Sequence, residues 1–522
     1  MLFSQAMSWS GLSNLEIELT TALKTMSDSK LNRTWLGHPV SLSTLFFTEL
    51  WERFSYYGMR ALLVLFMVDE VQKGGMGMND EMATSIYGLY TAFVYLACLP
   101  GGWIADRLLG ARKAVWVGGL IIAAGHFALA VPSQSTFFIG LLLVIIGTGF
   151  LKPNVSAMVG QLYPEGGARR DAGFTLFYMG INIGAFLGPL ICSYLGENIN
   201  WHIGFGAAGI GMLLGVIQYW VTSHRLGDTG LLATHRRASN ESTSGMDRAW
   251  YPVIGFFVVL TIVVALAFSG VLKVNALTLA QNTTYVIVGL AVVFFVYIFT
   301  FGKLNPTEFR QTQVIVVLFI ASAVFWSGFE QAGSSLNLFA ERHTNRLAFG
   351  FEIPSGWFQS LNPFYIVVFA PVFASLWISL AKRQLDPSMP AKFALGLLLL
   401  GLGFLLMVGA AKWVTAGNQA APYWLILTYL LHTMGELCVS PVGLSSVTKL
   451  APKRFVGQMM GIWFLATSLG NLIAGLMAGR FNPEAINEMP DLFLQIVLTS
   501  IGAAVLLILF TGRIKKLLVK MD

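Results

Sequence analysis

Apolar stretches of about 20 residues recur along almost the whole sequence, and this is the length of helix that crosses the hydrocarbon core of a bilayer. Only 11% of the 522 residues are charged, whereas soluble domains carry about 25%. A water-soluble globule is therefore excluded. The net charge of +7 does not indicate nucleic-acid binding, because the basic residues fall in short loops between the apolar stretches. The expected fold class is an all-α integral membrane protein.

Reading each stretch as one span predicts fourteen transmembrane helices in three groups. Six lie near 42–68, 82–105, 114–131, 137–161, 171–194 and 201–222, and six more near 312–340, 360–381, 391–413, 421–448, 456–479 and 490–513. A pair near 250–272 and 284–302 is interpreted as an inserted helical hairpin. The expected domains are a cytoplasmic tail (1–40), an N-terminal six-helix bundle (41–223), a cytoplasmic linker (224–249), the hairpin (250–302), a C-terminal six-helix bundle (303–514) and a second cytoplasmic tail (515–522). Such repeated halves are typical of transporters, with the substrate site at their interface.

The charges in the loops test this count independently. With the N-terminus in the cytoplasm, most loop Lys and Arg residues fall on the cytoplasmic side, as the positive-inside rule requires. The exceptions are Lys73, Lys273, Arg342, Arg346, Lys412 and Arg480. Both termini are therefore expected to be cytoplasmic. Residues 1–40 lack the features of a secretory signal, and because Met26 could begin a shorter chain, residues 1–25 are hypothesised to be a dispensable extension.

After the loop charges are assigned, seven Glu, Lys or Arg residues remain inside the predicted spans: Glu49, Glu52, Arg53, Arg60, Lys152, Glu330 and Glu436. Each costs about 2.5 to 3.5 kcal/mol to insert, so they are expected to face a wet cavity and to pair with one another. On the first helix, one helical stripe collects Glu49, Glu52, Arg53, Tyr56, Tyr57 and Arg60. Lipid cannot solvate such a stripe, so it must line a cavity or a polar partner surface. The alternative is a set of buried ion pairs that only fix packing.

These residues comprise three cations and four carboxylates, so one carboxylate lacks a cation. Breaking and remaking ion pairs during a conformational cycle could load and unload a proton, which suggests proton coupling. Because Glu49 lies one turn before Arg53, these two can pair within the helix. Glu52 is then left for Lys152 on the fourth span, and both pairings are hypotheses.

Signatures of other chemistry are missing from the sequence. It contains no paired metal-ligand spacing and no Gly-rich loop ending in Lys-Ser or Lys-Thr that would hold ATP. We therefore expect no enzyme activity and no cofactor, with protons as the coupling ion. Cys98, Cys192 and Cys438 lie in apolar segments and are expected to be packing residues, and His126 and His432 are interpreted as satisfied core residues in preference to proton relays.

Several segments resemble a known family. Residues 49–57, ELWERFSYY, resemble the ExxERFxYY signature of the proton-dependent oligopeptide transporter (POT/PTR2) family, bacterial peptide transporter type, within the major facilitator superfamily. Residues 177–184, FYMGINIG, are similar to the second signature FYxxINxG, and residues 102–112 resemble the loop 2–3 motif of the superfamily. Further matches lie at 149–154, 325–331, 362–363 and 436–445. The resemblance covers about 40–514, and the inserted hairpin is a feature of bacterial members.

The resemblance implies a symporter that imports di- and tripeptides with protons by alternating access between the two halves. Arg60 and Lys152 would then bind the peptide carboxylate, and Glu436, with Asn182 and Asn362 nearby, the amino terminus. The other expected substrate contacts are Tyr57, Tyr95, Glu330, Ser440, Trp326 and Trp463. For the aromatic residues Phe325, Trp326 and Trp463, packing within the bundle is an equal alternative. The implied proton-coupling residues are Glu49, Glu52 and Arg53, and the implied gating pairs are Arg60 with Glu330 and Lys152 with Glu436.

Two other functions remain open at this point. One is a nitrate or drug transporter on the same scaffold. Nitrate has no amino terminus and gives no reason to place Glu436 opposite Arg60 and Lys152, and a drug exporter would not need the complete stripe on the first helix. An intramembrane enzyme could use Glu49 and Glu52 as acid and base, but no nucleophile or metal constellation accompanies them. Animal members of the family carry a His on the second span, whereas residues 82–105 contain none, which assigns the proton to the first helix. The expected location is a bacterial inner membrane, with peptides, protons and lipid as partners and neither nucleic acid nor an obligate protein partner.

Overall fold

The computed structural model describes residues 34–165, 167–232, 244–348, 350–480 and 486–518. Most of the predicted N-terminal tail, including the hypothesis about residues 1–25, lies outside the described residues, as do residues 233–243 of the predicted linker. The last four residues of the predicted C-terminal tail, 519–522, also lie outside them.

The N-terminal half (the N-half) consists of α2 (Ser41–Val68), α3 (Asp80–Leu96) continued by α4 (Cys98–Ile104) and η2 (Ala105–Leu109), α5 (Ala111–Leu129), α6 (Gln134–Gln161), α7 (Gly167–Asn198) and α8 (Trp201–Thr222). The hairpin consists of α9 (Ser244–Phe268) and α10 (Ala276–Phe301). The C-terminal half (the C-half) consists of α11 (Pro306–Phe329), η5 (Glu330–Gly333), α12 (Ser335–His343), η6 (Ser355–Ser360), α13 (Leu361–Lys382), α14 (Met389–Thr415), α15 (Tyr423–Leu450), α16 (Val456–Ala478) and α17 (Met489–Leu518).

Short elements occupy the connections between these helices. The strands β1 (Thr34–Trp35) and β2 (His38–Pro39) form one antiparallel pair, and β3 (Leu347–Ala348) and β4 (Phe351–Glu352) form another. The single turns are η1 (Val71–Lys73), η3 (Ser223–Leu226), η7 (Lys453–Phe455) and η8 (Ile486–Glu488).

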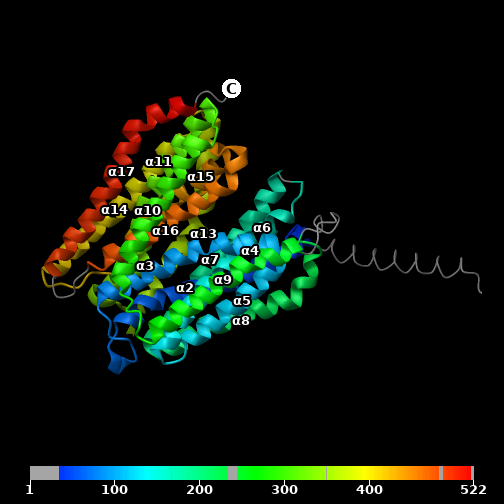
Figure 1. Cartoon of the computed structure of the whole chain (residues 1–522). Coiled ribbons are helices and arrows are strands. Elements are labelled where there is room, and N and C mark those ends of the chain that lie inside the picture. The colour runs from blue at the N-terminus through cyan, green and yellow to red at the C-terminus, as the bar shows by residue number, and fades with distance from the viewer. Residues whose placement is uncertain (1–33, 166, 233–243, 349, 481–485, 519–522) are drawn as a thin grey trace, which may run out of the picture.

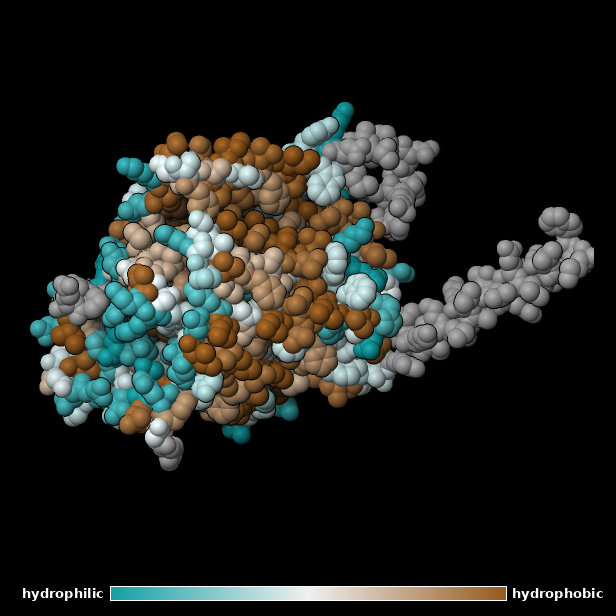
Figure 2. All heavy atoms as spheres, turned by 90° about the horizontal axis from the view of Figure 1, so that it is seen from below, coloured by the Kyte–Doolittle hydropathy of each residue, from teal (hydrophilic) through white to brown (hydrophobic). Residues whose placement is uncertain are grey.

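The predicted fourteen spans are confirmed as fourteen long helical segments within the described residues. Twelve of them are long and apolar enough to cross a membrane by composition alone, and α2 and α5 complete the set. These two are less apolar because α2 carries the charged stripe and α5 begins with Arg112 and Lys113. Figure 2 shows the matching surface, a broad hydrophobic band with hydrophilic side chains gathered toward its two ends. The chain is an integral membrane protein.

Several predicted helix boundaries are wrong. α10 begins at Ala276, eight residues before the predicted start at 284, because the side chain of Asn275 caps it by accepting the Thr278 N–H. The polar residues 281–284 interrupt the apolar pattern, so the hydropathy of the sequence did not predict the helix before them. α9 begins at Ser244 and α17 extends to Leu518, so both continue beyond the predicted bilayer limits.

The two halves meet at one end of the molecule and diverge toward the end that carries both termini of the described chain (Figure 1). We call these ends the far side and the termini side. On the far side α3 packs against α16, where a Cβ added to Gly475 would lie 2.5 Å from the Thr84 carbonyl oxygen and 2.7 Å from the Gly88 Cα. Small residues let the two backbones approach this closely. The far side is therefore closed by direct helix packing.

The hairpin connects the two halves around the outside. α10 packs against α16 of the C-half and α3 of the N-half through Ala280, Ile287 and Ala291, all buried. α9 contacts the N-half mainly near η2 and is otherwise exposed, with only 6% of its most apolar window buried. α10 is therefore anchored, whereas α9 lies loosely beside the N-half.

Candidate functional site

A polar cavity of about 150 Å³ lies between the two halves. Eight of the residues expected to bind substrate line it: Tyr57, Arg60, Tyr95, Asn182, Trp326, Glu330, Asn362 and Glu436. They come from α2, α3 and α7 of the N-half and from α11, η5, α13 and α15 of the C-half. Two larger hollows, of about 640 and 700 Å³, are lined mainly by apolar residues beside the hairpin. The cavity between the halves is therefore the candidate site.

Arg60 and Glu330 form the predicted ion pair across the cavity, with Arg60 Nη1 3.4 Å from Glu330 Oε2. Both side chains are buried, and the Tyr87 hydroxyl donates to the same carboxylate oxygen at 3.4 Å. The guanidinium also lies over the Tyr57 ring, 5.2 Å from its centroid. The contact joins α2 and α3 of the N-half to η5 of the C-half.

A break in the seventh span of the six-plus-six arrangement positions Glu330. The sequence predicted one continuous helix over 312–340, but α11 ends at Phe329 and the chain continues as the 3₁₀ turn η5 before α12. Gly333 ends this turn against α3, where an added Cβ would collide with the Tyr87 ring. The tight turn thus presents Glu330 to the cavity while Gly333 lets the two halves touch.

Glu436 is held from within the C-half. Asn362 Nδ2 donates to Glu436 Oε2 at 2.9 Å and to Thr433 Oγ1 at 3.0 Å, which joins α13 to α15. The amide therefore orients the carboxylate toward the cavity without neutralising its charge. Asn362 and Glu436 come together as the sequence predicted, whereas the predicted Lys152–Glu436 pair is not formed.

The three proton-coupling candidates form one buried cluster on α2. Arg53 Nε lies 2.8 Å from Glu49 Oε1 and 2.8 Å from Glu52 Oε2, so two carboxylates share one guanidinium. Glu49, Glu52 and Arg53 are at most 4% exposed. The predicted Glu49–Arg53 pair is confirmed, and the cluster holds one carboxylate more than it holds cations. One bound proton would balance its charge.

Lys152 lies apart from the carboxylates. Its Nζ is 3.9 Å from the centroid of the Tyr95 ring, and it forms no ion pair with any residue in the described ranges. The predicted pairing with Glu52 is wrong in this conformation, because Arg53 of the same helix is closer to that carboxylate. The ammonium instead faces an aromatic ring of its own half.

Besides Lys152, two predicted contacts lie outside the residues that line the cavity. Trp463 is 7% exposed and packs edge-on against Phe393 within the core of the C-half, where its ring abuts Gly443. Ser440 lies one turn beyond Glu436 on α15, and its hydroxyl is buried without a hydrogen-bond partner among the described residues. Trp326 does line the cavity, with its indole N–H unpartnered in the same set.

Sequence reasoning missed several residues of the cavity wall. Tyr178 and Tyr429 line it, as does Gln359, whose amide is 6% exposed and unpartnered within the described chain. Gln359 lies three residues before Asn362, so helical spacing could have grouped the two. His432, expected to be a satisfied core residue, is buried but lines the cavity, and its Nε2 has no hydrogen-bond partner in the described residues.

Polar contacts also join the halves at the far side. Glu197 at the end of α7 accepts hydrogen bonds from the backbone N–H of Ser355 at 2.6 Å and of Gly356 at 3.0 Å, at the start of η6. Arg342 of α12 binds Asp80 of α3 through two hydrogen bonds, at 2.6 and 2.9 Å. These residues were not among the predicted site, yet they hold the far side closed.

Comparison with known proteins places this arrangement in a family. The family model PTR2, described as the POT family, matches residues 112–489. The chain belongs to the POT family. It is 42% identical to the peptide transporter YePEPT of Yersinia enterocolitica subsp. palearctica over 506 residues, which is 95% of this chain and 98% of the relative. It is 40% identical to the di-/tripeptide transporter of Lactococcus lactis subsp. cremoris, over 85% of this chain and 90% of the relative.

Solved structures of POT proteins have the same fold. A crystal structure of a peptide transporter POT in complex with sulfate superposes with a TM-score of 0.86 at 39% identity, covering 95% of this chain and 99% of the other. A POT family transporter in complex with 5-aminolevulinic acid superposes with a TM-score of 0.84 at 34% identity, covering 92% and 98%. This POT chain therefore has the transporter fold of the major facilitator superfamily, in two six-helix halves with an inserted hairpin.

Proposed function

We propose that this protein is a proton-coupled symporter that imports di- and tripeptides by alternating access. The observation that carries the proposal is that the cavity presents Arg60 from the N-half and Glu436 from the C-half. A zwitterionic peptide offers a carboxylate to the first and an amino terminus to the second. Binding both ends of one molecule would draw the two halves together and favour an occluded state.

The relatives support this choice of substrate. One is named a peptide transporter and another a di-/tripeptide transporter, and a solved relative binds 5-aminolevulinic acid, which carries an amino group and a carboxyl group. Nitrate has a single negative charge and would leave Glu436 without a partner, so the nitrate reading is not favoured. We assign no enzyme activity, and the peptide is expected to leave chemically unchanged.

The remaining site residues receive roles from their positions. Tyr57 and Tyr95 would donate hydroxyls to the peptide backbone, Asn182 and Asn362 would support the amino end, and Trp326 would bound a side-chain pocket. For Lys152, Ser440 and Trp463, which lie off the cavity wall, the proposed contacts require the cavity to change shape. The cavity has a volume of about 150 Å³, whereas typical ligand sites have about 300–1,000 Å³. The wall of the cavity must therefore move to admit a peptide.

Proton coupling is assigned to Glu49, Glu52 and Arg53. Two carboxylates on one guanidinium have surplus negative charge in a buried site, which a proton from the gradient would neutralise. Arg60 with Glu330 is proposed as the gate of the far side, and Lys152 with Glu436 as a pair that forms only when the termini side closes. The inner membrane of a bacterium, with both termini cytoplasmic, is the proposed location, and no metal, cofactor or obligate protein partner is assigned.

The test is uptake of labelled dialanine into proteoliposomes, with and without an inward proton gradient, in competition with tripeptides, free alanine and nitrate. Accumulation that needs the gradient and is blocked only by peptides is the expected result. If the folded, inserted protein takes up no dialanine, or if nitrate competes, the peptide assignment is overturned. Glu436→Gln should weaken peptide competition, since it removes the anion proposed for the amino terminus.

A further inference from the structure

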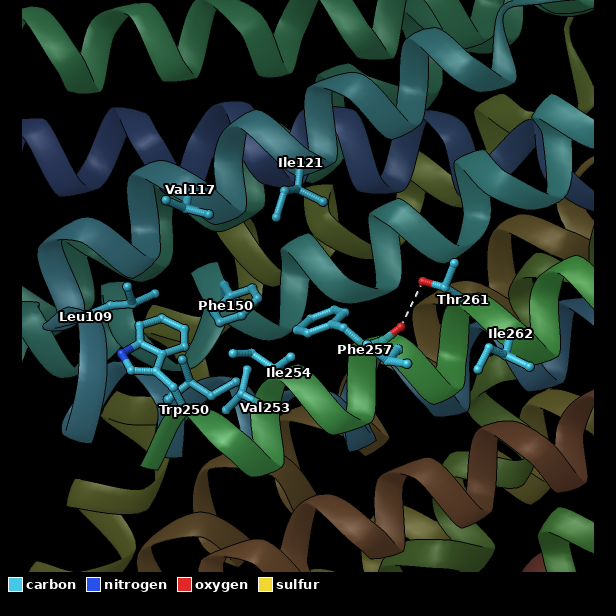
Figure 3. A pocket seen from close by; sticks show the side chains of 12 residues that line it. Leu109, Val117, Ile121, Phe150, Trp250, Val253, Ile254, Phe257, Thr261 and Ile262 are labelled. Atoms are coloured by element: carbon cyan, nitrogen blue, oxygen red, sulfur yellow. Dashed lines mark hydrogen bonds between the residues drawn. The ribbon is translucent and has the colours of Figure 1, made fainter. Parts of the chain in front are cut away.

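A long hollow separates α9 from the N-half near the termini side. Its volume is about 640 Å³, and we call it the α9 groove. The wall on the N-half includes Leu109, Val117 and Phe150, and the wall on α9 runs from Trp250 through Phe257 to Ile262 (Figure 3). An α-helix rises about 18 Å between residues twelve positions apart, such as Trp250 and Ile262, so the groove extends over more than half of the hydrocarbon thickness.

The groove is apolar along this length. Two polar side-chain groups occur among the residues that line it: the Trp250 indole N–H at one end, and the Thr261 hydroxyl, which donates to the Phe257 carbonyl oxygen at 2.8 Å (Figure 3). Water needs two to four polar partners to occupy a cavity, and the single indole N–H at one end is too few to hold it along the groove. Because α9 is a membrane-spanning helix with little buried surface, the groove opens to the bilayer. Its natural occupant is a hydrocarbon chain.

The mouth of the groove on the termini side is basic. Lys113 lies four residues before Val117 and eight before Ile121, so it continues the same helical stripe out of the groove. Its side chain is exposed and forms no ion pair with a residue in the described part of the chain. An exposed cation at the end of an apolar slot matches the two parts of an anionic phospholipid.

We propose that the α9 groove binds an anionic phospholipid, with one acyl chain between α9 and the N-half and the phosphate at Lys113. The lipid would complete the packing that α9 lacks, since α10 alone is fixed to α16 and α3. An acyl chain can also change its conformation, so it would keep the groove filled while the two halves move relative to each other. The proposal does not depend on which substrate the cavity transports.

The experiment measures lipid retention by native mass spectrometry of the purified full-length protein. The delipidated protein is titrated with phosphatidylglycerol and, separately, with phosphatidylcholine of the same acyl chains. We expect phosphatidylglycerol to bind several-fold more tightly. Equal retention of the two lipids would refute the assigned headgroup site, and retention of neither would refute the groove as a lipid site.

Two pairs of variants locate the site. Val258 lines the groove at 52% exposure, whereas Val259, at 59% exposure, is not among the residues that line it, so Val258→Trp fills the groove while Val259→Trp is its matched control. Val258→Trp should weaken phosphatidylglycerol binding about tenfold, which equals the loss of burial of about two methylene groups. Equal binding by these two variants would place the lipid elsewhere.

The headgroup is tested on the protein surface, where folding is not at risk. Lys113→Gln should weaken phosphatidylglycerol binding about fivefold, the effect of one basic residue near an anionic headgroup. Lys382→Gln, a change of an exposed lysine at the end of α13, should have no effect. If Lys113→Gln binds phosphatidylglycerol as tightly as the wild type does, the phosphate does not lie at this mouth and the proposal fails. This test does not require that the Val258→Trp variant can be purified.

Discussion

Glu197→Gln should open the far side of the molecule. The carboxylate of Glu197 accepts two backbone hydrogen bonds from η6 and one from the Ser355 hydroxyl at 3.0 Å, and it lies 3.7 Å from Arg346 Nη1. All of these partners belong to the C-half, whereas Glu197 belongs to α7 of the N-half. The glutamine keeps one oxygen, which can still accept one N–H. Its NH₂ group replaces the oxygen that served Ser355, so donors would face each other there.

The size of the effect follows from these contacts. A hydrogen bond to a charged acceptor contributes about 1.5–3 kcal/mol. The substitution removes the bond from the Ser355 N–H and weakens the bond from the Gly356 N–H, whereas the Ser355 hydroxyl can turn to accept from the new NH₂ group. We expect the closed far side to lose about 2–3 kcal/mol relative to the open one, an equilibrium shift of about 30- to 150-fold. A shift of this size converts a minor open population into a readily observed one.

The assay is a distance measurement by pulsed electron resonance between spin labels at Ile199 and Leu347. These two residues are 58% and 68% exposed and lie on opposite halves of the far side. The native cysteines are buried, so background labelling will be low. Glu197→Gln should add a population at longer distances.

The matched control for this measurement is Glu352→Gln. Glu352 Oε1 lies 3.0 Å from Arg346 Nη2, so this variant removes the same charge beside the same arginine. Both residues belong to the C-half, so no contact between the halves is lost and the distances should not change. An unchanged distribution in Glu197→Gln, or an equal shift in Glu352→Gln, would refute the reasoning.

Three further predictions concern the site and the closure. Glu52→Gln should abolish gradient-driven dialanine uptake while counterflow exchange continues, since the shared guanidinium no longer faces a surplus carboxylate; proton-driven accumulation in this variant would contradict the proton assignment. Asn362→Leu removes the donor that orients Glu436 and should weaken dialanine binding about tenfold or more, measured by competition, and unaltered affinity would remove Asn362 from the site. Gly475→Val should separate α3 from α16 and lower the stability of the closed far side by about 1–3 kcal/mol, seen as a lower melting temperature, whereas Gly502→Val, with open space around it, should melt like the wild type.

The polar stripe on α2 could be predicted because it depends on helical spacing alone. In this apolar segment Glu52 and Arg53 lie three and four residues after Glu49, and Arg60 lies seven residues after Arg53. These intervals place all four residues on one buried face of the helix. The partners of these residues could not be predicted in the same way. Whether Glu52 binds Arg53 or Lys152 depends on how α2 packs against α6, which no local pattern specifies.

The far-side contacts were hidden for a related reason. Glu197, Arg342 and Arg346 lie at the ends of predicted spans, where charged residues are ordinary and suggest solvation. Arg342 and Arg346 nevertheless stood out as exceptions to the positive-inside rule. Both bind carboxylates of the N-half, Asp80 and Glu197, so each exception has a structural reason. Basic residues that break the positive-inside rule could therefore have been used to predict contacts between the halves.

The polar contacts at the two ends explain why this conformation is closed at the far side. Toward that side, the ion pairs Arg60–Glu330, Arg342–Asp80 and Arg346–Glu197 all join one half to the other. Toward the termini side, Lys152 faces a tyrosine of its own half.

Glu436 likewise accepts from an asparagine of its own half. Lys152 and Glu436 therefore contribute nothing to closure until something outside their own halves binds them. A peptide with two charged ends, together with a proton on the α2 cluster, would offer Arg60 and Glu436 new partners. In doing so it would compete with Glu330 for Arg60. The same ligand would thus weaken the far-side contacts and bridge the halves at the cavity, which is the coupling that alternating access requires.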